Sequence, residues 1–121
     1  MKPDKDNRRK GFVYNNDVLA GIIEEVTDGF RYTYDTTYLA DPSSDAISLT
    51  LPKSPHPYTE RHLFAFFYGL LAEGPTRQLQ CLRLGLREQD YFGLLLATAH
   101  SDVIGSVTVR SSAEPDGEAT P

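Results

Sequence analysis

Three consecutive residues, His100, Ser101 and Asp102, carry the side chains of a hydrolytic catalytic triad. Nucleophilic catalysis of this kind needs the three groups to converge on one substrate atom from separate parts of a fold. Immediate neighbours in a chain do not converge in this way, and the Gly-x-Ser-x-Gly turn that exposes a nucleophilic serine is missing. We therefore interpret the triplet as a loop before a final strand, in which Asp102 accepts backbone N–H bonds.

The other candidates for metal or acid–base chemistry are equally sparse. His56 and His62 lie six residues apart without a cysteine or a second histidine pair nearby, so a zinc site is not expected. Glu73 follows an apolar stretch and could serve as a catalytic carboxylate, but Arg77, four residues on, is its expected ion-pair partner. We predict no catalytic residue, no metal site and no cofactor.

Phosphoryl-transfer motifs do not occur in the 121 residues. There is no glycine-rich phosphate loop, no His-Arg-Asp catalytic loop and no Asp-Phe-Gly segment. The run Tyr91-Phe92-Gly93 belongs to a helical pattern and is not a variant of the last motif. The sequence therefore predicts a protein that is not an enzyme.

Composition describes one acidic globular domain. Apolar residues make up 40% of the chain and there are 13 Tyr and Phe, enough for one compact core. The formal net charge of -5 is uneven, because residues 1–10 carry five Lys or Arg against two acids, whereas residues 11–110 carry seven bases against twelve acids. An acidic body disfavours nonspecific binding to nucleic-acid phosphates and favours a basic protein partner.

The chain has the composition expected of a soluble cytoplasmic protein. Cys81 is the only cysteine, so no intrachain disulfide can form. No run approaches the roughly 18 apolar residues of a membrane helix, and no signal-peptide core follows the basic start. We expect a basic flexible N-terminus at 1–10, a folded domain at 11–110 and a disordered acidic tail at 111–121.

Alternation of apolar and polar residues predicts a small, mostly antiparallel sheet. The triplet Asn15-Asn16-Asp17 tolerates the positive φ of a tight hairpin turn, and aromatic residues alternate with polar ones over 30–34. Pro52 is expected to end a later strand. The predicted strands are residues 11–14, 18–26, 30–34, 47–51 and 104–110.

Helical periodicity predicts about three helices, and with them an α+β fold. The first is expected over 59–72 with Thr59 as its N-cap, because apolar residues recur on one face at 63, 66, 67, 70 and 71. The second runs from Pro75 to Leu84, where Gly85 ends it, and the third covers 88–99.

Five blocks in fixed order resemble the N-terminal subdomain of HipA-type kinase toxins. The resemblance covers residues 12–109 and implies an α+β unit that packs on the kinase core of a bacterial serine/threonine kinase toxin. Ala72 and Ala99 depart from it, since the family pattern has proline and glycine at these points. The blocks are Phe30-Arg31-Tyr32-Thr33-Tyr34 with Tyr38-Leu39, Ser48-Leu49-Thr50-Leu51-Pro52, Leu70-Leu71-Ala72-Glu73-Gly74, Asp90-Tyr91-Phe92 with Leu94-Leu95, and Asp102-Val103-Ile104-Gly105-Ser106-Val107.

Split systems that resemble this arrangement pair a small antitoxin, HipS, with a shortened kinase, HipT, and a DNA-binding protein, HipB. Without kinase motifs, this chain is expected to stand alone as a HipS-like antitoxin that binds and inhibits a HipT-like serine/threonine kinase toxin. A HipB-like protein would join through the kinase, with no direct nucleic-acid or membrane contact. The alternatives are a noninhibitory structural subunit or remnant of a HipA-type kinase, and a small enzyme supported only by the His100 triplet.

The predicted partner-binding residues lie on a proline-stiffened loop at 53–58 and on an aromatic edge of the first predicted helix. A preset loop conformation lowers the ordering cost of docking, and Tyr58 is the leading contact. Phe64 and Tyr68 either complete the core or act as aromatic anchors, and Tyr58 has the same alternative of packing at the helix start. The predicted set is Lys53, His56, Tyr58, His62, Phe64 and Tyr68.

Overall fold

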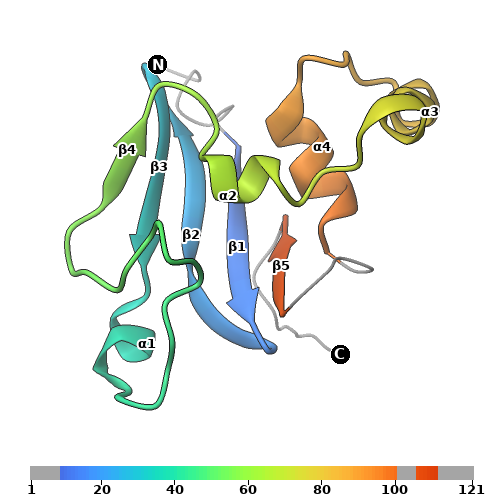
Figure 1. Cartoon of the computed structure of the whole chain (residues 1–121). Coiled ribbons are helices and arrows are strands. Elements are labelled where there is room, and N and C mark those ends of the chain that lie inside the picture. Colours follow the sequence, from blue (N-terminus) through green and yellow to red (C-terminus); the bar gives the residue numbers. More distant parts are fainter. Residues whose placement is uncertain (1–8, 101–105, 112–121) are drawn as a thin grey trace, which may run out of the picture.

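The computed structural model describes residues 9–100 and 106–111, and its centre is a five-stranded sheet (Figure 1). The spatial order is β4-β3-β2-β1-β5, and each neighbouring pair is antiparallel. The predicted α+β class with an antiparallel sheet is therefore confirmed. The strands are β1 (Lys10–Asn15), β2 (Val18–Val26), β3 (Gly29–Tyr34), β4 (Tyr58–Glu60) and β5 (Val107–Arg110).

The β1–β2 hairpin forms where the turn residues predicted it. Asn16 and Asp17 have φ values of 53° and 66°, a conformation that short polar side chains tolerate. The register shifts between Val13 and Tyr14, where a bulge interrupts the pairing with β2. β3 begins at Gly29, one residue before the strand predicted at 30–34.

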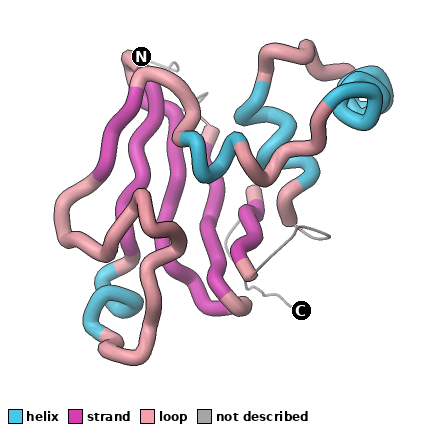
Figure 2. Tube along the Cα trace, viewed as in Figure 1, coloured by secondary structure: helices cyan, strands magenta, loops and turns pink. Residues whose placement is uncertain are grey.

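Four helices are described, and they differ in how closely they contact the sheet (Figures 1 and 2). α1 packs on β2, while α4 packs on β5 and on α2. Figure 1 shows α3 end-on and well separated from the strands. The helices are α1 (Thr36–Ala40), α2 (Ala65–Tyr68), α3 (Gly74–Leu84) and α4 (Tyr91–Thr98).

One face of the sheet carries the core. Val13, Ile23, Tyr32 and Val109 alternate inward along their strands and are fully buried. A Cβ atom at Gly21 would come within 2.5 Å of the Tyr32 hydroxyl oxygen, so the aromatic ring needs a glycine at this position of β2. From the other side the core is completed by Phe67, Phe92, Leu94 and Leu95.

The helix predicted over 59–72 is wrong. Tyr58–Glu60 instead pairs with β3 as the edge strand β4, so Thr59 lies opposite Arg31 and is not an N-cap. Helical hydrogen bonding is confined to α2, and residues 70 and 71 follow in tighter turns that bond to Phe67 and Tyr68. Pairing with an open strand edge has overridden the helical pattern. The apolar stripe nevertheless packs in or against the core.

The strand predicted at 47–51 is also wrong, because the chain reverses there. Ser48 and Leu51 form an isolated bridge, and the Ser48 hydroxyl accepts the Thr50 backbone N–H at 3.2 Å. Both Ile47 and Leu51 are buried, whereas Leu49 is fully exposed at the tip. The apolar residues that alternate over 47–51 therefore belong to a turn whose first and last residues, Ile47 and Leu51, are buried.

Two further helices and the last strand agree with the predictions. α3 begins at Gly74 with Pro75 in its first turn and ends at Gly85, which has a left-handed φ of 70°. α4 is shorter than expected because the Asp90 carboxylate caps it, accepting the N–H of Gly93 at 3.0 Å. Residues 104 and 105 of the predicted last strand lie outside the described residues. α1 was not predicted; its signal is Asp35, which accepts the Tyr38 N–H.

Two residues of the segment predicted as a basic N-terminus at 1–10 are among the described residues. β1 begins at Lys10, and Arg9 contacts both the sheet and α4. Residues 1–8 of the predicted basic N-terminus and 112–121 of the predicted tail lie outside the described residues. No helix within 9–100 and 106–111 has the length and apolar character to cross a bilayer.

Candidate protein-binding surfaces

The three histidines considered for catalytic or metal chemistry are all exposed. His100 is exposed at the end of α4, with its Nε2 atom 2.9 Å from the Ala97 carbonyl oxygen. Its predicted loop neighbours, Ser101 and Asp102, lie outside the described residues. His56 and His62 are both exposed. Among the described residues, no group of three or more His, Cys, Asp or Glu could hold a metal ion.

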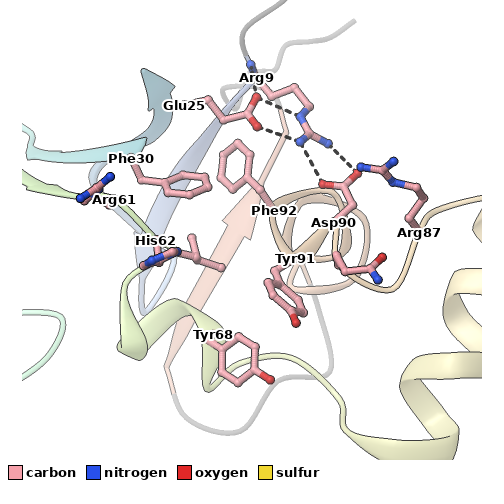
Figure 3. Close-up of a pocket in the computed structure, with 12 residues that line it drawn as sticks. Arg9, Glu25, Phe30, Arg61, His62, Tyr68, Arg87, Asp90, Tyr91 and Phe92 are labelled. Carbon is pink, nitrogen blue, oxygen red and sulfur yellow. Dashed lines mark hydrogen bonds and ion pairs between the residues drawn. The ribbon is translucent and has the colours of Figure 1, made fainter. Parts of the chain in front are cut away.

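A half-open cleft of about 770 Å³ separates α4 from the segment that joins β4 to α2 (Figure 3). Phe30 and Phe92 meet edge to face in this cleft with their ring centroids 5.5 Å apart. Arg61 and Arg87 lie at its two sides, and the positive charge of Arg87 contributes to lowering the pKa of Asp90. The cleft combines aromatic walls with exposed cations. Its lining is completed by Arg9, Glu25, His62, Leu63, Tyr68, Gln89, Asp90 and Tyr91.

Arg9 closes one end of the cleft by joining β2 to the start of α4. Its Nη2 atom lies 2.8 Å from Glu25 Oε2 and 2.9 Å from Asp90 Oδ1, and Nη1 lies 3.0 Å from Asp90 Oδ2. Hydrogen bonding to Arg9 lowers the pKa of Glu25 and of Asp90, although partial burial acts in the opposite direction. The same bonds raise the pKa of Arg9. Because four of its five guanidinium N–H donors are used in these bonds, Arg9 acts as a structural tether between β2 and α4.

The predicted docking loop, 53–58, is held in place by its own side chains. Lys53 Nζ donates to the carbonyl oxygens of Asp41 and Ser44, both at 3.0 Å, and lies over the Tyr38 ring. The Tyr58 hydroxyl donates to the Pro52 carbonyl at 2.7 Å, and its half-buried ring packs against the core. Lys53 therefore supports the loop, and His56 is its most accessible predicted contact.

The aromatic edge predicted on the first helix divides into one buried and one exposed ring. Phe64 is 6% exposed and packs against Phe67, so it belongs to the core. Tyr68 is 37% exposed and meets Tyr91 edge to face at 5.1 Å. The Arg77 guanidinium lies over both tyrosine rings and donates to the Ala72 carbonyl at 2.8 Å. Arg77 thus contacts tyrosines in place of the predicted partner Glu73.

Three exposed leucines on α3 were not predicted as contact residues from the sequence. On α3, Leu79 is 50% exposed, Leu82 is 82% exposed and Leu84 is 47% exposed. The available signal was the spacing of the leucines in this helix, which places them on more than one face and so exceeds what one core stripe needs. Arg9 carried no local signal, since its partner Asp90 lies 81 residues away.

Comparison with known proteins identifies the family to which this arrangement belongs. A family model described as the HipA N-terminal domain matches residues 12–110, which is most of the chain. The chain belongs to the HipA N-terminal domain family. The resemblance predicted from the five sequence blocks is confirmed, and the match is to a noncatalytic domain.

Two individual proteins extend the comparison with the HipA N-terminal domain family. An uncharacterised protein of Haemophilus influenzae is 27% identical over 106 residues, which cover 88% of this chain and 95% of that protein. A solved structure described as the N-terminal domain of HipA toxin has a TM-score of 0.65 and 24% sequence identity, covering 88% of this chain and 94% of that chain. The structural likeness establishes a common fold.

Proposed function

We propose that this HipA N-terminal domain protein is a HipS-like antitoxin that binds and inhibits a HipT-like serine/threonine kinase toxin in the bacterial cytoplasm. The observation that carries the proposal is a HipA N-terminal domain over residues 12–110 in a sequence that contains none of the kinase catalytic motifs. A chain without catalytic residues can act on a kinase only through the surfaces with which it binds. Direct protein–protein contact is therefore the proposed mechanism.

Burial reduces the number of predicted contact residues that can touch a partner directly. His56 and His62 are exposed, Tyr58 is half-buried, and Tyr68 is 37% exposed. Lys53 and Phe64 act by holding the loop and the core behind these contacts. Because the loop is already ordered by internal hydrogen bonds, docking loses little conformational entropy.

Inhibition by this surface would be steric and conformational. The loop at 53–58 and the exposed ring of Tyr68 would contact the nucleotide-binding lobe of the kinase and hold it out of its active geometry. The acidic body of the chain, which carries an excess of five acids over residues 11–110, favours a partner with a basic contact region. A HipB-like DNA-binding protein would join the complex through the kinase.

The direct test is coexpression of the full chain with a HipT-like kinase from the same genome, scoring growth and copurification together. An inhibitory antitoxin restores growth and copurifies with the kinase. Copurification without restored growth would identify a noninhibitory subunit. If the two proteins neither copurify nor restore growth, the proposal fails and a remnant of a HipA-type kinase becomes the better explanation.

Substitutions in the loop test the contact assignment. His56→Ala removes an exposed side chain, and Tyr58→Ala removes a ring that also packs on the core, so folding of the latter must be verified by circular dichroism. A buried aromatic anchor costs at least about 2 kcal/mol of binding free energy when truncated, or roughly 30-fold in Kd. Val18→Ala, at an exposed position in the β1–β2 hairpin, is the matched control. Wild-type affinity in both folded loop variants would rule out this contact surface.

A further inference from the structure

The helix α3 is fixed to the domain but exposes its apolar side chains to solvent. Of its eleven residues only Cys81 is buried. Leu79 and Leu82 are 50% and 82% exposed, and residues three apart lie on the same side of a helix. We call these two side chains the leucine ridge.

The opposite side of α3 holds the helix in place. Arg77 belongs to α3, and its guanidinium is 5.1 Å from the Tyr68 ring centroid and 5.5 Å from that of Tyr91. Residues two apart point roughly 200° apart around a helix, so an inward Arg77 turns Leu79 outward. At the other end, Gly85 closes the helix in a left-handed conformation and Leu86 N–H bonds to the Cys81 carbonyl at 3.0 Å. Arg77 and the buried Cys81 therefore hold one side of α3 against the domain, and the ridge lies on the opposite side.

The ridge is an apolar element with a cationic border. Arg83 follows Leu82 and is exposed, and α3 contains no Asp or Glu. Two copies of this chain meeting through the ridge would bring their Arg83 side chains close together, and each chain also carries a formal net charge of -5. Charge therefore disfavours self-association and favours a different protein whose groove has carboxylates at its rim.

We propose that the leucine ridge docks into an apolar groove of the HipT-like kinase, with Arg83 facing carboxylates at the edge of that groove. This inference rests on the proposed function and adds a second contact surface to it, on the side of the domain that carries α3 (Figure 1). A helix that lays an apolar face into a groove on its partner is a recurring mode of protein recognition. The kinase would then contact two separate segments of this chain, the loop at 53–58 and the leucine ridge on α3.

The test is the affinity of the full chain for the purified HipT-like kinase, measured by isothermal titration calorimetry for wild type and three variants. Leu79→Gln with Leu82→Gln removes the ridge while keeping good helix-forming residues. The matched control is Leu49→Gln, the same substitution at a fully exposed leucine on the turn at 48–51. Arg83→Glu reverses the border charge.

We expect the ridge variant to bind at least about 30-fold more weakly, as for the loss of an interface hot spot, and the Leu49 control to bind within about threefold of wild type. Arg83→Glu should weaken binding at low salt and lose most of that effect at high salt. If the folded ridge variant binds as tightly as wild type, the ridge is not the docking element, and the proposed antitoxin function still stands.

Three other outcomes separate this inference from the function on which it rests. A wild-type chain that does not bind the kinase overturns both. Ridge-dependent binding without restored growth supports the ridge and overturns inhibition. A wild-type dimer in light scattering that the ridge substitutions convert to monomer would assign the ridge to a second copy of this chain and overturn the choice of the kinase.

Discussion

Tyr34 and Tyr32 provide a matched pair of substitutions with opposite expected effects on stability. They lie two residues apart on the core face of β3, and their rings meet edge to face with centroids 4.9 Å apart. The Tyr34 hydroxyl donates to the Leu51 carbonyl and accepts the Ile47 backbone N–H, so it fixes both ends of the turn that presents Leu49. The Tyr32 hydroxyl is buried with no hydrogen-bond partner among the described residues. Each Tyr→Phe change removes one hydroxyl and keeps the ring.

The expected magnitudes follow from what each hydroxyl leaves behind. Without the Tyr34 hydroxyl, the N–H of Ile47 and the carbonyl of Leu51 stay buried without this partner, and each such group costs about 1–3 kcal/mol. We expect Tyr34→Phe to lower the free energy of unfolding by about 2–3 kcal/mol and Tm by roughly 8–12 °C. Tyr32→Phe removes an unpaired buried hydroxyl and should raise the free energy of unfolding by about 1 kcal/mol.

Urea denaturation followed by far-UV circular dichroism measures both changes, and the slopes should stay equal to that of the wild type. Burial raises the pKa of Tyr32, so its hydroxyl stays neutral at any pH used for the assay. The reasoning is refuted if Tyr34→Phe is as stable as wild type, or if Tyr32→Phe loses as much stability as Tyr34→Phe. Either result would mean that the hydrogen bonds of the Tyr34 hydroxyl do not stabilise the turn against the sheet.

Two further predictions concern the Arg9 tether and Gly85, which caps the C-terminal end of α3. Arg9→Ala should lower the free energy of unfolding by about 1 kcal/mol at pH 7, a modest value because the pair is partly exposed. The folded-state pKa values of Glu25 and Asp90 are lowered, so the difference in stability between wild type and variant is full above about pH 5 and disappears as the pH falls through those values. Urea titrations of both proteins at several pH values would measure it. A difference in stability that grows toward low pH contradicts the assignment. Gly85→Ala should lower the free energy of unfolding by about 1 kcal/mol because Gly85 has a φ of 70°, and Gly85→Asn should lower it less. Thermal unfolding of the two variants would measure the difference. Equal Tm values for the two variants would argue against left-handed strain at this position.

Features set by a few neighbouring residues were predictable. The hairpin follows from Asn16 and Asp17, which accept a positive φ, and the end of α3 follows from Gly85. Both depend on the steric freedom of single residues and not on distant contacts. The aromatic alternation of β3 likewise identified the face that packs against the core.

Predictions that depended on where a segment packs were less successful. Tyr58–Glu60 lies in a stretch with helical periodicity, yet its backbone groups pair with the free edge of β3. An edge of unpaired N–H and carbonyl groups outweighs a weak helical preference, and the sequence does not reveal which edge is open. The same limit placed Phe64 on the predicted binding surface, although its ring lies in the core.

The amino-acid sequence by itself determined the family, the antiparallel α+β class and the lack of kinase motifs, because these reside in residue order and in short-range patterns. Only the tertiary structure decided which side chains are available to a partner. Arg9 reaches Asp90 across 81 positions to tie β2 to α4, and Arg77 turns inward against two tyrosines so that Leu79 and Leu82 face solvent. Exposure is a property of all the elements packed around a residue, and no local pattern encodes it.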